Sequence, residues 1–263
     1  MTRILAVLLI LAPAVRADEA EPAPKKLTDK ERAAAEKAAK AHLEKLGGKA
    51  ARFTEIKDEA LAKAMPGHAF YAVLFPQYPV GRMPPEKLKV ANVFAADGKG
   101  KVAAITSLKE LEKFLGASMP AASGEAGRKG AAQAAVRLGQ ELHQDGFYKF
   151  KADDAKAEKG KASAKAVVMS GGSGAYSVTL AFSDGGKVTG LEEKSELVPG
   201  PRPICQATKL LDPDPIVRGM AEQALVCMGR ACKPYLTEQR AKASPELRGA
   251  IDRLWRRIAA AGR

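Results

Sequence analysis

The stretch DPIVRGMAEQALVCMG at residues 214–229 is the clearest structural signal in the chain. Asp214 followed by Pro215 is typical of a helix start, because a short acceptor side chain caps free N–H groups and proline fits the first turn. Apolar residues then recur at helical spacing as far as Met228, and Gly229 is a typical helix stop. We therefore expect a helix over this stretch.

A second start of the same kind, Ser244-Pro245, opens the stretch SPELRGAIDRLWRRI at residues 244–258. Between the two stretches, residues 231–242 fit a shorter helix that tolerates Pro234 in its first turn. Each of the two long stretches has one apolar stripe opposite polar residues, which predicts an amphipathic helix. We expect these stripes to pack on the preceding sheets of the same molecule.

The first of these helices, with the turn and helix that follow, resembles a HEAT-like repeat. The resemblance depends on the opening Asp214-Pro215-Ile216-Val217-Arg218, the turn at Gly229 and a Pro-x-Leu second helix. The other matching positions are Ala221, Leu225, Ala231, Pro234 and Leu236. The chain holds about one and a half copies, whereas solenoids need about three to stand alone. The resemblance implies paired antiparallel helices, which often serve as protein-interaction surfaces.

The N-terminal residues 1–17 have the pattern of a secretory signal peptide. Arg3 precedes an apolar core at residues 4–11, which is too short to span a membrane, and small or tolerated residues lead to Ala17. We predict cleavage near Ala17 and an exported protein, periplasmic or secreted, without a transmembrane segment in the mature chain. Residues 18–28 are rich in alanine, proline and charge, which predicts a disordered lead-in.

Two segments of the chain share one plan, a helix followed by antiparallel strands. Thr28 and Glu31 form a capping-box pattern that opens an alanine-rich helix, and the second segment begins with a helix at residues 131–143. The expected strands are residues 53–56, 68–75, 89–94 and 101–106 in the first segment, followed by a helix at 108–115, and residues 147–150, 164–169, 175–182 and 187–197 in the second. Residues 34–53 align with residues 131–150 without gaps, mostly on alanine, and we infer a duplication.

The sequence therefore predicts the α+β class, with two helix-plus-antiparallel-sheet lobes followed by a C-terminal helical HEAT-like segment. The expected units are a first lobe at 29–116, a linker at 117–130, a second lobe at 131–200 and the helical segment at 201–263. Residues 153–165 read as an exposed loop or lid, and Ser170-Gly171-Gly172-Ser173-Gly174 as a hairpin connection. A helix cradled by a curled antiparallel sheet is similar to cystatin-like and nuclear-transport-factor-like folds, which imply no function.

The chain is strongly basic, with a formal net charge of +13, which favours contact with anionic surfaces and polymers. The last helix carries the best candidates for an anion- or partner-binding site, because guanidinium groups bind carboxylate and phosphate in a bidentate fashion. These candidates are Arg248, Arg253, Trp255, Arg256 and Arg257. The alternative is a solvated outer face of the helix, with Asp252 neutralising part of its charge.

The three cysteines are Cys205, Cys227 and Cys232. In an oxidising compartment, a Cys227–Cys232 bridge would span the turn between the first two C-terminal helices, if the geometry allows it. A bridge from Cys205 to either partner would instead tie the incoming segment to the helices. The third alternative is three small buried apolar residues without a bridge.

The sequence contains no pattern for a cofactor or a metal. The only histidines, His42, His68 and His143, lie far apart in the chain, and neither His-Glu-x-x-His nor paired Cys-x-x-Cys occurs. We therefore expect structural histidines, no metal site and no assignable catalytic residue.

Three function classes follow. The first is an exported non-enzymatic binding or scaffold protein that acts on a protein or an anionic envelope polymer. The second is a hydrolase or lyase with a pocket in one cradle-shaped lobe and His68 or His143 as base, which requires a histidine and a carboxylate together in a concave site. The third, and least favoured, is nucleic-acid binding through the arginine-rich last helix.

Overall fold

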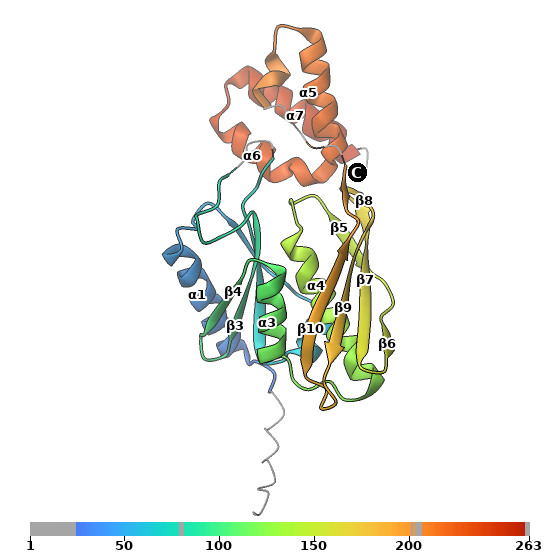
Figure 1. Cartoon of the computed structure of the whole chain (residues 1–263). Coiled ribbons are helices and arrows are strands. Elements are labelled where there is room, and N and C mark those ends of the chain that lie inside the picture. Colours follow the sequence, from blue (N-terminus) through green and yellow to red (C-terminus); the bar gives the residue numbers. More distant parts are fainter. Residues whose placement is uncertain (1–24, 79–81, 201, 203–206, 261–263) are drawn as a thin grey trace, which may run out of the picture.

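The computed structural model describes residues 25–78, 82–200, 202 and 207–260. The predicted signal peptide, most of the lead-in and Cys205 lie outside these ranges. The described residues confirm the α+β class, since helices accompany two larger antiparallel sheets. Figure 1 shows the two sheets in one body, with the C-terminal helices beyond one end of it.

The first sheet is an antiparallel meander in the order β1-β2-β3-β4. Its strands are β1 (Arg52–Glu55), β2 (His68–Leu74), β3 (Ala91–Asp97) and β4 (Val102–Ile105). Helix α1 (Asp29–Lys45) covers one face, because alternate β2 residues Ala69, Tyr71 and Val73 share a core with its buried alanines. The predicted capping box is confirmed: the side chains of Thr28 and Glu31 each accept a hydrogen bond from the other residue's backbone N–H.

The second sheet has the order β10-β9-β7-β5, with β6 also paired to β7. Its strands are β5 (Lys149–Ala152), β6 (Lys156–Glu158), β7 (Lys161–Ser170), β9 (Ala175–Phe182) and β10 (Val188–Ser195). Along β9, every second side chain from Tyr176 to Phe182 is buried, as the alternation in the sequence predicts. This sheet therefore has one inner and one outer face.

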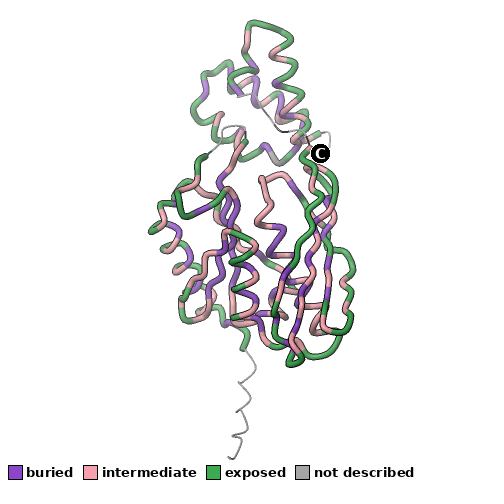
Figure 2. The backbone as a smooth tube through the Cα atoms, in the orientation of Figure 1, coloured by how far each residue is buried: buried purple, intermediate pink, exposed green. Residues whose placement is uncertain are grey.

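Helix α4 (Gly124–Leu142) lies between the two sheets. Its buried residues, including Ala135 and Leu138, share one core with Phe70 of the first sheet and Val178 of the second. Helix α3 (Leu108–Ser118) packs against both β4 and β10, and the short α2 (Glu59–Ala64) packs against α4. The layers are therefore α1, first sheet, central helices and second sheet, and buried residues follow the facing sides of these layers in Figure 2.

The predicted linker at residues 117–130 is largely helical in the structure. Helix α3 continues to Ser118 and α4 begins at Gly124, so only residues 119–123 connect them. The many glycines and alanines led to the prediction of a linker. In the structure, an ion pair of 2.6 Å between Glu125 and Lys129, one helical turn apart, supports the first turns of α4. Burial against two sheets then outweighs the low helix propensity of glycine. The two expected lobes consequently share one core.

Two further segments also differ from expectation. Residues 153–165, expected to be a loop or lid, contain β6 and the start of β7, because Ala162 and Ala164 face the core while lysines alternate outward. Leu27, assigned to the disordered lead-in, is only 8% exposed and donates its N–H to Pro66 O at 3.1 Å. Small or isolated apolar residues gave too weak a pattern to predict either feature.

The hairpin connection at residues 170–174 is compact. Gly171 and Gly174 have φ angles of 82° and 96°, and a Cβ atom at Gly171 would lie 2.0 Å from Phe147 O. Between them, β8 (Gly172–Ser173) pairs with β11 (Val198–Pro199). These glycines are therefore required both by backbone conformation and by close approach of neighbouring strands.

The three longer C-terminal helices begin at or within two residues of the predicted positions, and two short helices that were not predicted accompany them. In chain order, these helices are η1 (Ala207–Leu211), α5 (Pro215–Met228), η2 (Gly229–Cys232), α6 (Lys233–Lys242) and α7 (Pro245–Ala260). The Asp214 side chain accepts from Ile216 N at 2.8 Å, and Ser244 Oγ accepts from Leu247 N at 3.3 Å. Both proline-led caps are thus confirmed.

The apolar stripes of these helices pack on one another, and the prediction that they pack on the sheets is wrong. Leu225, Leu236 and Leu254 belong to a buried cluster whose described members all lie between Ala207 and Ile258. An ion pair of 3.6 Å between Arg82 and Glu238 joins the unit to the body. The C-terminal helices therefore form a unit with its own core.

The close packing of α4 predicts opposite effects for two glycines of this helix. A Cβ atom at Gly139 would lie 2.2 Å from the Tyr176 hydroxyl oxygen, whereas a Cβ atom at Gly130 meets nothing within 4 Å. We expect Gly139→Ala to lower the free energy of unfolding by about 1–3 kcal/mol through overpacking. Gly130→Ala should be neutral or stabilise by up to about 1 kcal/mol. Denaturant unfolding measures both, and equal effects would contradict this account of the packing.

Candidate ligand-binding groove

One face of helix α4 is polar and partly buried, with Gln140 only 8% exposed, and it lines a groove. The residues on this face follow a spacing of i, i+4, i+7, i+8 and i+11, which places them on one side of a helix. They are Gln133, Arg137, Gln140, Glu141 and Gln144, the last lying just past the helix C-terminus. These residues were not predicted as a site, although their spacing in the sequence places them on one side of a helix.

A cavity of about 770 Å³ opens beside this polar face, between α2, α4 and β5. The segment from β1 to the end of α2 contributes charges of both signs, and β5 with the loop before it contributes aromatic rings. The charged residues are Lys57, Asp58, Glu59, Lys63 and Lys149, and the aromatic residues are Tyr148 and Phe150. All the lining elements belong to the shared body of the two lobes.

A second cavity of about 200 Å³ continues on the other side of Arg137, Glu141 and Gln144. There Arg52, Thr54, Ala72 and Leu74 of the first sheet form the opposite wall. Because the same three α4-side residues line both spaces, we treat the two cavities as one inter-lobe groove. Ligand sites often occur at such boundaries between structural units.

Arg137 forms the charged centre of the inter-lobe groove. Its guanidinium is paired with Glu141 one helical turn away, and its Nε lies 3.7 Å from Asp58 Oδ2. The side chains of Arg137 and Glu141 are only 25% and 13% exposed, so both charges have lost much of their hydration. Each therefore depends on the other for stabilisation.

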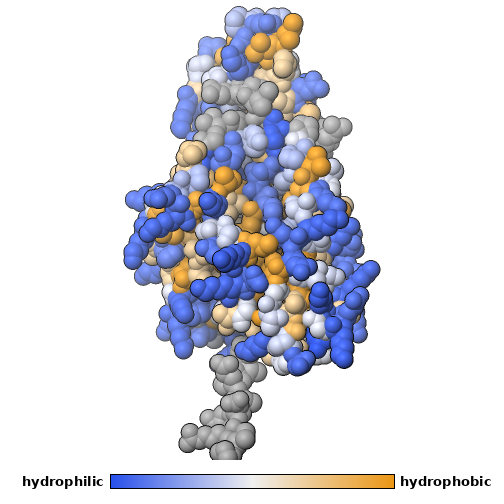
Figure 3. Space-filling view, viewed as in Figure 1, coloured by the Kyte–Doolittle hydropathy of each residue, from blue (hydrophilic) through white to orange (hydrophobic). Residues whose placement is uncertain are grey.

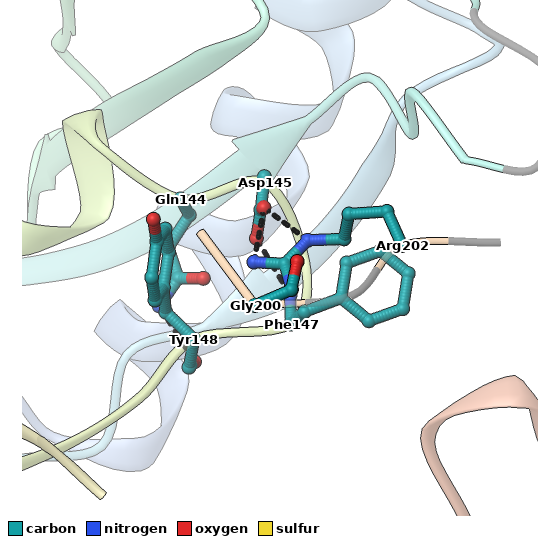
Figure 4. A network of polar contacts seen from close by, with 6 residues as sticks. All are labelled: Gln144, Asp145, Phe147, Tyr148, Gly200 and Arg202. Atoms are coloured by element: carbon teal, nitrogen blue, oxygen red, sulfur yellow. Dashed lines mark hydrogen bonds and ion pairs between the residues drawn. The ribbon is translucent and has the colours of Figure 1, made fainter. Parts of the chain in front are cut away.

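The loop at residues 144–148 borders the inter-lobe groove and is fixed from behind by Arg202, as Figure 4 shows. The Arg202 guanidinium donates from Nε to Asp145 Oδ2 at 2.6 Å and lies 4.7 Å from the centre of the Phe147 ring. Gln144 donates its amide to Tyr148 O at 3.1 Å. With its side chain 6% exposed, Arg202 is a buried anchor that holds this rim in one conformation.

The predicted arginine-rich site on α7 is exposed and lies apart from the inter-lobe groove. Arg257 pairs with Glu222 at 3.3 Å, and Trp255 lies under the ammonium group of Lys233 at 5.4 Å. No ion pair involves Arg248, Arg253 or Arg256 within the described ranges. The structure thus brings the predicted residues onto one helix, without a cavity that holds them together.

Asp252 does less for this surface than expected. Its two carboxylate oxygens accept from Arg240 Nε and a terminal nitrogen of the same guanidinium at 2.7 and 3.0 Å, across from α6. This bidentate pair lowers the pKa of Asp252. The carboxylate therefore ties α6 to α7 more than it neutralises the α7 arginines.

The two described cysteines are free thiols, so the predicted Cys227–Cys232 bridge is not formed. Cys232 is buried and its thiol donates to Gly229 O at 3.1 Å, whereas Cys227 is exposed on α5. Burial raises the pKa of Cys232 to about 11. A buried protonated thiol is unreactive, and it packs as a small apolar residue.

The three histidines occupy different environments. His42 contacts Phe94 edge-on at 5.5 Å, and His143, at the C-terminus of α4, lies 3.0 Å from Glu193 Oε2. His68 lines a cavity of about 500 Å³ together with Asp97. Burial lowers the pKa of His68, and the nearby Asp97 charge partly opposes this shift. Within the described ranges, no cluster of three or more potential ligands is placed to hold a metal.

None of the helices within the described ranges is long and apolar enough to cross a bilayer. The chain matches no model of a known family, no curated protein and no solved structure. The structure therefore describes the protein as an α+β body with a polar groove and a C-terminal helical unit that has its own core.

The charged centre of the groove should be sensitive to the loss of either partner. Arg137→Leu leaves Glu141 without its cation, and we expect a loss of about 1–3 kcal/mol in the free energy of unfolding. Adding Glu141→Leu should restore part of that loss. Lys129→Leu is a matched control, since its pair with Glu125 on the same helix is largely exposed and should matter little. Additive effects at Arg137 and Glu141 would contradict this account.

His68 should make stability depend on pH. Its folded-state pKa lies below the ordinary value of 6.5, so below that pH the unfolded chain binds the proton more readily. This contribution to stability is complete well above the ordinary value of 6.5 and is lost as pH falls below it. We expect His68→Gln to flatten that part of the stability profile. Identical profiles for wild type and His68→Gln would show the expectation to be wrong.

Proposed function

We propose that this protein is an exported, non-enzymatic binding protein that holds a polypeptide segment of a partner protein in the inter-lobe groove. The observation that carries the proposal is the row of three glutamines beside the partly buried Arg137–Glu141 pair. The signal-peptide pattern of residues 1–17 supports export.

The glutamines suit a peptide backbone. A carboxamide offers both N–H donors and a carbonyl acceptor, which are the groups that a peptide bond itself presents. Gln144 is held by its bond to Tyr148 O, and neither Gln133 nor Gln140 bonds through its side chain to another described residue. Their amides can therefore pair with a bound chain, while Tyr148 and Phe150 offer aromatic contact.

The charges of the inter-lobe groove favour a polypeptide over an anionic polymer. The groove carries charges of both signs, which a chain of repeated negative charge would match only in part. The cations are Lys57, Lys63, Arg137 and Lys149, and the carboxylates are Asp58, Glu59 and Glu141. A segment with mixed or alternating charge matches the groove better. Of the two partner classes predicted from the sequence, the groove therefore supports the protein.

The C-terminal unit is consistent with contact to proteins. Helix α5 leaves Ile216 and Met220 largely exposed, at 71% and 59%. The HEAT-like resemblance of this segment also implies protein-interaction surfaces.

A selection from a random peptide library on the immobilised protein tests the proposal. We expect enriched peptides to bind at least about tenfold more weakly to a Gln133→Ala/Gln140→Ala variant, because the two amides that bond to no other described residue would be lost from the groove. Fluorescence anisotropy with a selected peptide measures the change. An Arg253→Ala/Arg256→Ala/Arg257→Ala variant should keep full affinity.

Two results would overturn the proposal. One is that no peptide is enriched over an unrelated protein. The other is that the arginine variant loses affinity while the glutamine variant keeps it, which would move the binding site to α7.

A further inference from the structure

A further cavity, separate from the inter-lobe groove and different in chemistry, lies between the first sheet and α3. It measures about 500 Å³, within the range of about 300–1,000 Å³ that is common for small-molecule sites. Small residues of β3, β4 and α3 leave this space open, and Phe114 and Ile105 add larger apolar walls. The small residues are Ala95, Ala103, Ala104 and Ala117.

The same region is visible from outside the molecule. On the face in Figure 3, apolar surface gathers along the middle, over α3, between hydrophilic flanks. The cavity is lined there by the two exposed lysines Lys101 and Lys113. An apolar space bordered by cationic groups suits a ligand that has both an apolar body and a charged end.

The carboxylates of this cavity are already engaged by the protein. Asp97 Oδ1 accepts from Lys99 N and Lys101 N, both at 2.9 Å, within the β3–β4 turn. Glu110 Oε2 accepts from Thr106 N at 2.6 Å and from Thr106 Oγ1 at 2.8 Å, at the start of α3. Both acidic groups thus serve the local backbone. They keep their negative charge, which the two lysines of the cavity balance.

The lysines and the histidine of this cavity are available to a ligand. Among the described residues, neither ammonium group of Lys101 and Lys113 forms a hydrogen bond or an ion pair. His68 packs edge-on against Phe114 at 5.5 Å, which places an imidazole against the apolar wall. The groups left for a ligand are therefore two ammonium ions and one imidazole.

From this arrangement we infer that the cavity binds an amphipathic carboxylate. The hydrocarbon or aromatic body lies against Ala95, Ile105 and Phe114, and the carboxylate pairs with Lys101 and Lys113. The polar atoms of the His68 ring offer a further hydrogen bond to the ligand. No hydrogen bond joins His68 to Asp97, Glu110 or Ser118 within the described ranges, so the imidazole can bond to a ligand.

Titration calorimetry with sodium decanoate below its micelle concentration tests the inference. We expect decanoate to bind, and both butanoate and decan-1-ol to bind at least about tenfold more weakly, because each lacks either the long body or the charge. A Lys101→Gln/Lys113→Gln variant should lose at least about tenfold in decanoate affinity. Lys109→Gln, on the same helix but outside the cavity, should bind like wild type.

Two further variants separate this cavity from the inter-lobe groove. Ala103→Phe should abolish decanoate binding by filling the space, while the exposed lysine substitutions keep the test valid if this variant does not fold. Gln133→Ala/Gln140→Ala should bind decanoate normally. The inference is overturned if decanoate does not bind, if Lys109→Gln weakens binding as much as the double lysine variant, or if only the groove variant loses affinity.

Discussion

Burial of α4 between two antiparallel sheets is the contact on which the body depends. A helix can approach two sheets at once only where its side chains are small, and the buried face of α4 is rich in alanine. Gly139 brings the helix backbone against the Tyr176 ring in the same way. Since dense interiors tolerate little change in volume, this one helix fixes the spacing of both sheets.

The inter-lobe groove follows from the same packing. Two sheets and α3 cover most of the circumference of α4, and the short α2 covers only part of what remains. The remaining side carries Gln133, Arg137 and Gln140, which line the groove. The position of the groove is therefore a consequence of how the helix is buried, and Arg202 stabilises its rim from the opposite side.

Much of the fold could be predicted from local patterns. Caps at Thr28, Asp214 and Ser244 and the alternation along β9 depend on neighbouring residues, and the structure has them where the sequence placed them. The start of α4 and the β6–β7 hairpin could not be predicted, because glycine and alanine adopt a helix or strand there only when the other layers cover them. The prediction that the C-terminal stripes pack on the sheets was wrong for a related reason, since an apolar stripe does not specify which surface it meets. The groove is lined by α2, α4 and β5, and α2 lies far from the other two in the sequence.

The separate core of the C-terminal helices has a consequence for how such a chain can change over evolutionary time. Leu225, Leu236 and Leu254 shield one another, and the polar pair Arg82–Glu238 lies where the unit meets the body. Gene fusion or loss near the end of the second sheet would leave both cores intact, so this unit is an exchangeable module. Related bodies that carry other modules at the same end would be equally well folded.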